Sequence, residues 1–203
     1  MNKHMKSKVA LFLFVGVMAG MILFAIFFRD SFVTFLQHPV WLEHARFVHI
    51  AAASLFFSNA IVGFLWEMKS LASGNKAVIL HTYNTVTFLD SMFSSPLIIL
   101  LLLGGLSLSF TLGDLWQIGW LSLSFHLFLL SGVLWIASDI PTQYKVKRLI
   151  SQLNQDDQDL PAELLRLLKL RWWISMAGVL PLVIVFILMV YRPDIAPIGD
   201  WFR

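Results

Sequence analysis

Long runs of apolar residues, separated by short polar segments, dominate the pattern along this chain. Five of these runs match the roughly 20 residues that a helix needs to cross the hydrocarbon core of a bilayer. They cover residues 9–28, 47–66, 91–110, 116–138 and 172–191. Backbone N–H and C=O groups in lipid must bond within their own segment, and the runs lack the alternation of barrel strands, so each run predicts a transmembrane helix. The sequence therefore predicts an all-α polytopic membrane protein with five transmembrane helices.

The composition supports a membrane protein and excludes several other classes. Of the 203 residues, 58% are hydrophobic and 13% are charged, and the mean hydropathy is +0.77. Soluble domains have nearer half apolar and a quarter charged residues, so an ordinary soluble enzyme and a disordered chain are excluded. The absence of cysteine excludes disulfides, iron–sulfur clusters and a thiolate nucleophile. The net charge of +3 is small and follows from the topology, so no nucleic-acid partner is expected.

Lysine and arginine are unevenly distributed between the two sides of the predicted spans. With the N-terminus in the cytoplasm, eleven of the 15 lie in cytoplasmic segments, namely Lys3, Lys6, Lys8, Lys69, Lys76, Lys145, Lys147, Arg148, Arg166, Lys169 and Arg171. The other four lie outside, namely Arg29, Arg46, Arg192 and Arg203. Because cytoplasmic loops carry the excess of these residues, we expect an inner-membrane protein of bacterial type with its N-terminus inside and its C-terminus outside.

The first apolar run also has the basic flank of a secretory signal peptide. It is too long for a typical signal peptide, however, and it ends in Phe-Phe-Arg-Asp at residues 27–30 without a small-residue cleavage site. We therefore expect a retained helix.

The one sizeable polar segment, residues 141–171, predicts a helical hairpin between the last two spans. Its first helix carries apolar residues at helical spacing, namely Val146, Leu149, Ile150 and Leu153. An acidic turn follows at residues 154–159, and Pro161 can open a second helix. The apolar pattern continues through Leu164, Leu165, Leu168 and Leu170. This hairpin either lies on the membrane surface or docks a partner.

His49 is the first of several candidate functional residues, because ionisable and polar side chains inside a membrane are costly. It shares a helical face of the second span with Ala52, Phe56, Asn59, Gly63 and Trp66. Small residues let helices approach closely and polar residues bond across the contact, so this face is expected to point into the helix bundle. His49 is then either a neutral imidazole bonded to a neighbouring helix or a ligand of haem or of a metal.

His126 lies near the middle of the fourth span. It shares a face with Gly119, Ser122 and Leu129, and a second polar stripe on the same helix contains Ser124, Ser131 and Ser138. His126 is either bonded to a neighbouring group or serves as a ligand or a proton relay.

Asp90 opens the third span. It either pairs with Arg171, Lys69 or a hydroxyl of another helix, or it caps the helix at the inner membrane boundary. Pro96 lies inside the same span and is expected to kink it. The nucleotide-binding, metalloprotease and serine-hydrolase motifs are absent from the sequence, as is any metal-ligand motif.

Several sequence motifs, in a fixed order, resemble a known family. An Asp-x-x-Phe-x-x-Pro core at residues 90–96 is followed by Gly104-Gly105-Leu106. Trp120-Leu121, Ser131-Gly132 with Trp135, and Gln143 come next, and the last span runs from Arg171-Trp172 through Gly178 and Pro181 to Tyr191-Arg192-Pro193. Over residues 43–193 the chain resembles the predicted integral membrane proteins called domain of unknown function 2269.

This resemblance implies a four-helix membrane core at residues 43–193, to which an N-terminal helix and outer loop (1–42) and a short outer tail (194–203) are added. The family looks like a distant relative of the haem-binding membrane protoporphyrinogen oxidase and of the copper-resistance D protein. His49, in Val48-His49-Ile50, is similar to a histidine of that oxidase. The lysine of the oxidase's third core helix corresponds to Ser124 here, and Leu89-Asp90 replaces its Met-Glu pair.

Three functional hypotheses follow from these residues. The first is a haem-binding or redox-linked protein that uses His49, with His126 as a possible second ligand. The second is a solute or metal permeation protein with a path lined by His126, Asp90 and the serine stripe. The third is a non-catalytic subunit or assembly factor that binds another membrane protein or a second copy of itself. Whether the chain is an enzyme is left open, and the lipid bilayer is the one partner common to all three.

Overall fold

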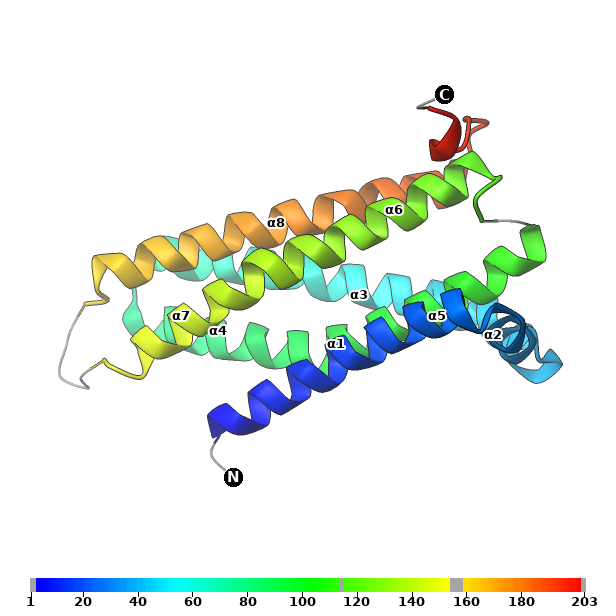
Figure 1. The fold of residues 1–203 in the computed structure, drawn as a ribbon. Coiled ribbons are helices and arrows are strands. Elements are labelled where there is room, and N and C mark those ends of the chain that lie inside the picture. Colours follow the sequence, from blue (N-terminus) through cyan, green and yellow to red (C-terminus); the bar gives the residue numbers. More distant parts are fainter. Residues whose placement is uncertain (1–2, 114, 154–158, 202–203) are drawn as a thin grey trace. The chain divides into compact units, whose positions relative to one another are not determined.

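The computed structural model describes residues 3–113, 115–153 and 159–201, and every regular element in these ranges is helical (Figure 1). Four continuous helical stretches are long and apolar enough to cross a membrane: Pro39–Ser73, Lys76–Leu112, Gly119–Ile150 and Ala162–Tyr191. They contain three of the five predicted spans and all but the first three residues of a fourth, 116–138, and they confirm the all-α polytopic architecture.

The first apolar run, residues 9–28, lies almost wholly in one helix, and the chain bends sharply just after it. Helix α1 (Lys3–Phe27) is followed at once by the short helix α2 (Arg29–Leu36), and the axes of 12–25 and 29–36 differ by 109°. The pair counts as a fifth span only if both helices are taken together. Helix α2 packs through Phe32 and Leu36, which are buried.

Helices α3 (Pro39–Ser73) and α8 (Ala162–Tyr191) are longer than the apolar runs that predicted them. At 1.5 Å per residue, the 35 residues of α3 extend about 50 Å, well beyond a hydrocarbon core of about 30 Å. Pro161 precedes the first turn of α8, as expected for a proline at a helix start. Helix α3 ends just before Gly74, whose φ of +64° allows the left-handed turn that terminates it.

Two short π-helical turns interrupt the second and third spanning stretches, each just before a proline. The stretch Lys76–Leu112 consists of α4 (Lys76–Leu89), η1 (Asp90–Ser94) and α5 (Ser95–Leu112), with Pro96 two residues beyond η1. The stretch Gly119–Ile150 repeats this order with α6 (Gly119–Leu134), η2 (Trp135–Asp139) and α7 (Ile140–Ile150), and Pro141 stands two residues beyond η2. A proline ring clashes with the carbonyl four residues earlier, and a widened turn relieves that clash. The irregularity expected at Pro96 is thus a π-helical turn.

The chain divides into two compact units. The first contains residues up to 57 together with 89–112, and the second contains 58–88 together with 113–203. In the first unit, the Ser107 hydroxyl of α5 donates a 2.5 Å hydrogen bond to the Leu36 carbonyl at the end of α2, and both residues are fully buried. This bond satisfies one of the carbonyls that a helix C-terminus leaves without an intrahelical partner.

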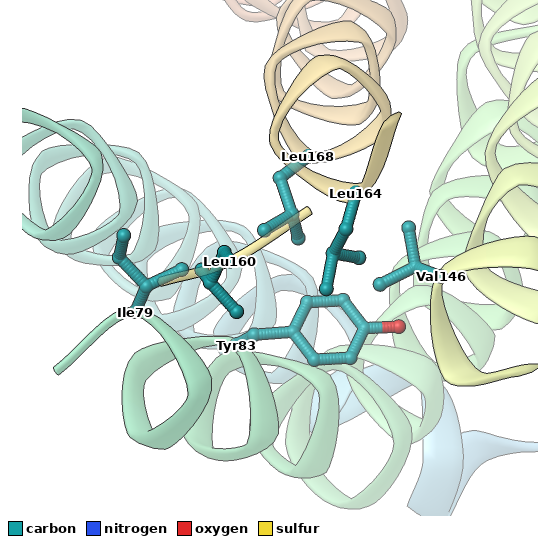
Figure 2. Close-up of a cluster of buried hydrophobic side chains, with 6 residues drawn as sticks. All are labelled: Ile79, Tyr83, Val146, Leu160, Leu164 and Leu168. Atoms are coloured by element: carbon teal, nitrogen blue, oxygen red, sulfur yellow. The ribbon is translucent and has the colours of Figure 1, made fainter. Parts of the chain in front are cut away.

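In the second unit, α6 and α8 run side by side (Figure 1) and are joined by the Ser131 hydroxyl, which donates to the Gly178 carbonyl at 2.6 Å. A hydrophobic core lies where α4, α7 and the start of α8 meet (Figure 2). Its buried members are Ile79, Tyr83, Val146, Leu160, Leu164 and Leu168.

The segment that predicts a surface hairpin continues the spanning helices in the structure. Helix α7 follows η2 without a break, and α8 runs from Ala162 to Tyr191 as one helix. The apolar residues Val146, Leu164 and Leu168 pack into the chain's own core, whereas Leu170 is 48% exposed. The apolar stripe on each helix therefore reflects internal packing. Most of the expected acidic turn, residues 154–158, lies outside the described residues.

Candidate functional site

His49 lies on α3 in the first unit, and one of its ring nitrogens is held by a neighbouring helix. Its Nδ1 is 3.0 Å from the carbonyl oxygen of Leu101 on α5. A carbonyl oxygen can only accept, so Nδ1 carries the hydrogen and donates it. The other nitrogen, Nε2, then has an available lone pair. This arrangement fixes the tautomer and the orientation of the imidazole.

A glycine pair on α5 makes room for this histidine. A Cβ atom at Gly104 would lie 3.0 Å from the His49 Cβ and 3.2 Å from the Ala45 carbonyl oxygen. A Cβ atom at Gly105 would lie 3.1 Å from Cε1 of the imidazole ring. Helices α3 and α5 therefore approach within the first unit as closely as small residues allow.

The face of α3 that contains His49 is buried as expected, except at its end. Ala52 and Phe56 are buried, and Asn59 is half-buried. Trp66 was expected on this face, but it is 48% exposed, and Glu67 is buried in its place. Glu67 comes 18 residues after His49, which is about five turns at 3.6 residues per turn, so Glu67 and not Trp66 is in phase with the histidine.

The remaining predicted site residues have different surroundings. His126 is exposed, its Nδ1 is 2.8 Å from the Ser122 carbonyl, and its ring packs edge-on against Trp116. Ser124 is buried, and its hydroxyl donates to the Trp120 carbonyl of the same helix.

Asp90 is half-buried in the first unit as the first residue of η1. Its backbone carbonyl accepts a hydrogen bond from the Ser95 hydroxyl at 3.0 Å. Lys69, one of its expected partners, is exposed.

Arg171, the other basic partner considered for Asp90, pairs in the second unit with residues that the sequence had not singled out. Its Nη1 donates to Oε1 of Glu67, and its Nε lies 3.7 Å from Oδ1 of Asp139. The side chains of Arg171 and Asp139 are each 3% exposed, and that of Glu67 is 10% exposed. The Tyr83 ring faces the guanidinium, whose carbon is 5.3 Å from the ring centroid.

Neutral groups complete the surroundings of Asp139, the last residue of η2. Its Oδ2 accepts a 2.8 Å hydrogen bond from Gln143 Nε2, and its Oδ1 accepts a 3.1 Å bond from the Ser175 hydroxyl. We call Glu67, Asp139 and Arg171, together with Tyr83, Gln143 and Ser175, the charge cluster. A buried ion pair is tolerated when its remaining polar atoms are hydrogen-bonded, as they are around Asp139.

A sequence signal for the charge cluster exists, but no single span contains it. Glu67 directly follows the run 47–66, Asp139 directly follows 116–138, and Arg171 directly precedes 172–191. Because alternate spans run in opposite directions, all three residues end their runs at the same membrane boundary. A single charged residue at the end of a span is usually interpreted as a solvated anchor. Three such residues at the same boundary, with opposite charges, indicate a cluster.

Comparison with known proteins gives one match. No curated protein and no solved structure matches the chain. The model of the family described as "Predicted integral membrane protein (DUF2269)" matches residues 43–193, which include His49 and the whole charge cluster. That description gives a membrane location and no activity. With its long apolar helices and this match over most of its length, the chain is a multi-pass integral membrane protein and belongs to the DUF2269 family.

Proposed function

We propose that this membrane protein binds haem, with His49 as the residue that would ligate its iron. The observation that carries the proposal is the hydrogen bond from Nδ1 to the Leu101 carbonyl, which leaves the Nε2 lone pair available. Histidines that ligate metals commonly donate their other ring N–H to a carbonyl or carboxylate, which orients the ring and raises its basicity. The donor chemistry of His49 therefore fits an iron ligand.

The surroundings of His49 add support for this role. Gly105 lies against the edge of the imidazole ring, so the ring has little freedom to turn away from the Leu101 carbonyl. The Val48-His49-Ile50 stretch also resembles the histidine context of the haem-binding oxidase. A bound haem would supply one-electron redox chemistry, and His49 would hold it from α3.

The other two functional hypotheses find less support. In the serine stripe proposed to line a permeation path, the Ser124 hydroxyl donates to the Trp120 carbonyl of its own helix, and the Ser131 hydroxyl donates to the Gly178 carbonyl of α8. The inner hairpin proposed to dock a partner places its apolar residues in the core of the second unit. No specific contact among the described residues favours either function over haem binding.

The test is the visible spectrum of the full-length protein purified in detergent after expression with added haem. The wild-type protein should show a Soret band, and His49→Ala should lose it. His44→Ala is the matched control, because His44 is an exposed histidine five residues earlier on the same helix. If His126→Ala also loses the band, His126 contributes to binding. A colourless wild-type protein, or a band that survives in His49→Ala, would refute the proposal.

We also propose that the N-terminus lies in the cytoplasm and the C-terminus outside, in a bacterial inner membrane. The support is the distribution of Lys and Arg, eleven against four. Because the chain lacks cysteine, single cysteines can be introduced into the full-length protein at the exposed positions Ser151 and Thr111. A membrane-impermeant maleimide applied to intact cells should label Thr111→Cys and spare Ser151→Cys. The reverse labelling would overturn this orientation.

A further inference from the structure

The charge cluster contains more negative than positive charge. In the salt bridges of the described second unit, Glu67 of α3 and Asp139 of η2 both face Arg171 of α8. The neighbouring groups from α4, α7 and α8, namely Tyr83, Gln143 and Ser175, are neutral in their ordinary forms. Two ionised carboxylates around one guanidinium leave one negative charge in excess. Burying such a charge is costly, and binding a proton removes the cost.

We infer that Glu67 and Asp139 together hold one exchangeable proton, and that Arg171 pairs with whichever carboxylate is ionised. The reaction is the binding of one H⁺ to one carboxylate oxygen, which gives a neutral carboxylic acid with no change in oxidation state. The two groups behave as a coupled pair, so the proton belongs to the pair. This site is independent of haem binding at His49.

The contacts of Asp139 suit both of its protonation states. Its two neutral partners are the Ser175 hydroxyl and the Gln143 amide. A hydroxyl and a primary amide can each either donate or accept a hydrogen bond. They donate to an ionised Asp139, and after rotation of the hydroxyl or the amide one of them accepts from a protonated Asp139. Glu67 accepts directly from Arg171 in the arrangement described here, so we assign a proton taken up by the pair to Asp139, with the Ser175 hydroxyl turning to accept from it.

The alternative arrangement needs only a small displacement. The Arg171 Nε is already 3.7 Å from Asp139 Oδ1, slightly beyond hydrogen-bonding distance. The face of the Tyr83 ring supports the guanidinium without fixing its direction. When Arg171 moves toward Asp139, the proton passes to Glu67. We assign proton exchange with the surroundings to Glu67, because it is the more exposed of the two carboxyls.

The position of the charge cluster in the fold favours proton exchange at one membrane surface. The three charged residues end their apolar runs at the same boundary. Asp139 also closes the π-helical turn η2, a type of irregularity that occurs frequently at functional sites. Figure 2 shows the Tyr83 ring lying beside Leu164 in the apolar core, so apolar side chains border the charge cluster on this side.

Infrared spectroscopy of the full-length protein in lipid nanodiscs tests this proposal. At neutral pH the wild-type spectrum should contain the C=O stretch of a protonated carboxylic acid, and the band should shift in D₂O because its proton exchanges. Glu67→Gln and Asp139→Asn should each abolish it, because the remaining carboxylate then forms a balanced pair with Arg171. Asp90→Asn and Glu163→Gln are the controls and should keep it.

Three outcomes would overturn the proposal. The first is a wild-type spectrum without the band, which needs no variant and so does not depend on how a variant folds. The second is a band that persists in either Glu67→Gln or Asp139→Asn, since one group would then hold its proton alone. The third is loss of the band in Asp90→Asn, which would assign the proton to Asp90.

Discussion

Replacing Gly104 by alanine should weaken the contact between α3 and α5. The new Cβ would lie 3.0 Å from the His49 Cβ, 3.2 Å from the Ala45 carbonyl oxygen and 3.4 Å from the His49 Cα. All three atoms belong to the backbone of α3 or are attached directly to it, so no side-chain rotation can move them away. Carbon atoms pack best at about 3.5–4.0 Å, so the two helices must separate locally by roughly half an ångström.

The expected loss of stability combines two opposing effects. Overpacking a close contact typically costs about 1–3 kcal/mol. Alanine is better than glycine in a helix interior by roughly 0.5–1 kcal/mol. The net loss in free energy of unfolding should therefore be about 1 kcal/mol, and it should grow if α3 cannot shift.

The measurement is reversible unfolding in detergent micelles with increasing SDS, followed by far-ultraviolet circular dichroism. Gly132→Ala on α6 is the matched control, because no heavy atom lies within 4 Å of a Cβ built there. This control should be at least as stable as the wild type, since only the gain in helix propensity remains. If Gly104→Ala is as stable as Gly132→Ala, the close approach at His49 is wrong.

Two further substitutions test contacts in the second unit by the same unfolding assay. Gly119→Ala should cost about 1–3 kcal/mol, because the new methyl group would collide with the backbone carbonyl of Ile195. Gly199→Ala has open space and should be near neutral, so equal stability of the two variants would contradict that contact. Arg171→Gln should cost about 3–5 kcal/mol, because it leaves a buried carboxylate without its cation. Lys169→Gln, exposed on the same helix, should change stability by less than about 0.5 kcal/mol, and an equally small effect of Arg171→Gln would show that the charge cluster contributes nothing to stability.

Local sequence rules were sufficient for the helices and for several of their boundaries. The last apolar run ends at Tyr191 and so does α8, and Pro161 stands just before the first residue of that helix. The irregular turn near Pro96 follows from the missing N–H and the bulk of the proline ring. These features depend on residues within one or two turns of each other, so the sequence pattern contains the information needed to predict them.

The sequence alone was less able to assign the role of each polar side chain. Periodicity placed His49 and Ala52 on the buried face correctly, but it followed that face to Trp66 when the buried residue is Glu67. The spacing of three and four residues accumulates error along a long helix, and an aromatic residue at the end of a span resembles an interfacial anchor. The serines of α6 resembled a polar path, although one hydroxyl bonds within its own helix and another bonds to α8.

The sequence by itself determined that this chain is a helical membrane protein and where its long apolar helices lie, and it identified His49 as a candidate functional residue. Only the tertiary structure determined which carbonyl holds that imidazole and which carboxylates surround Arg171. The physical reason is the separation along the chain. Arg171 and Glu67 are 104 residues apart, and Ser175 and Asp139 are 36 apart, so no local period connects them. A buried charge acquires its partner from helix packing, and the residue that ends an apolar run becomes a solvated anchor or a member of a charge cluster according to the helix that packs against it.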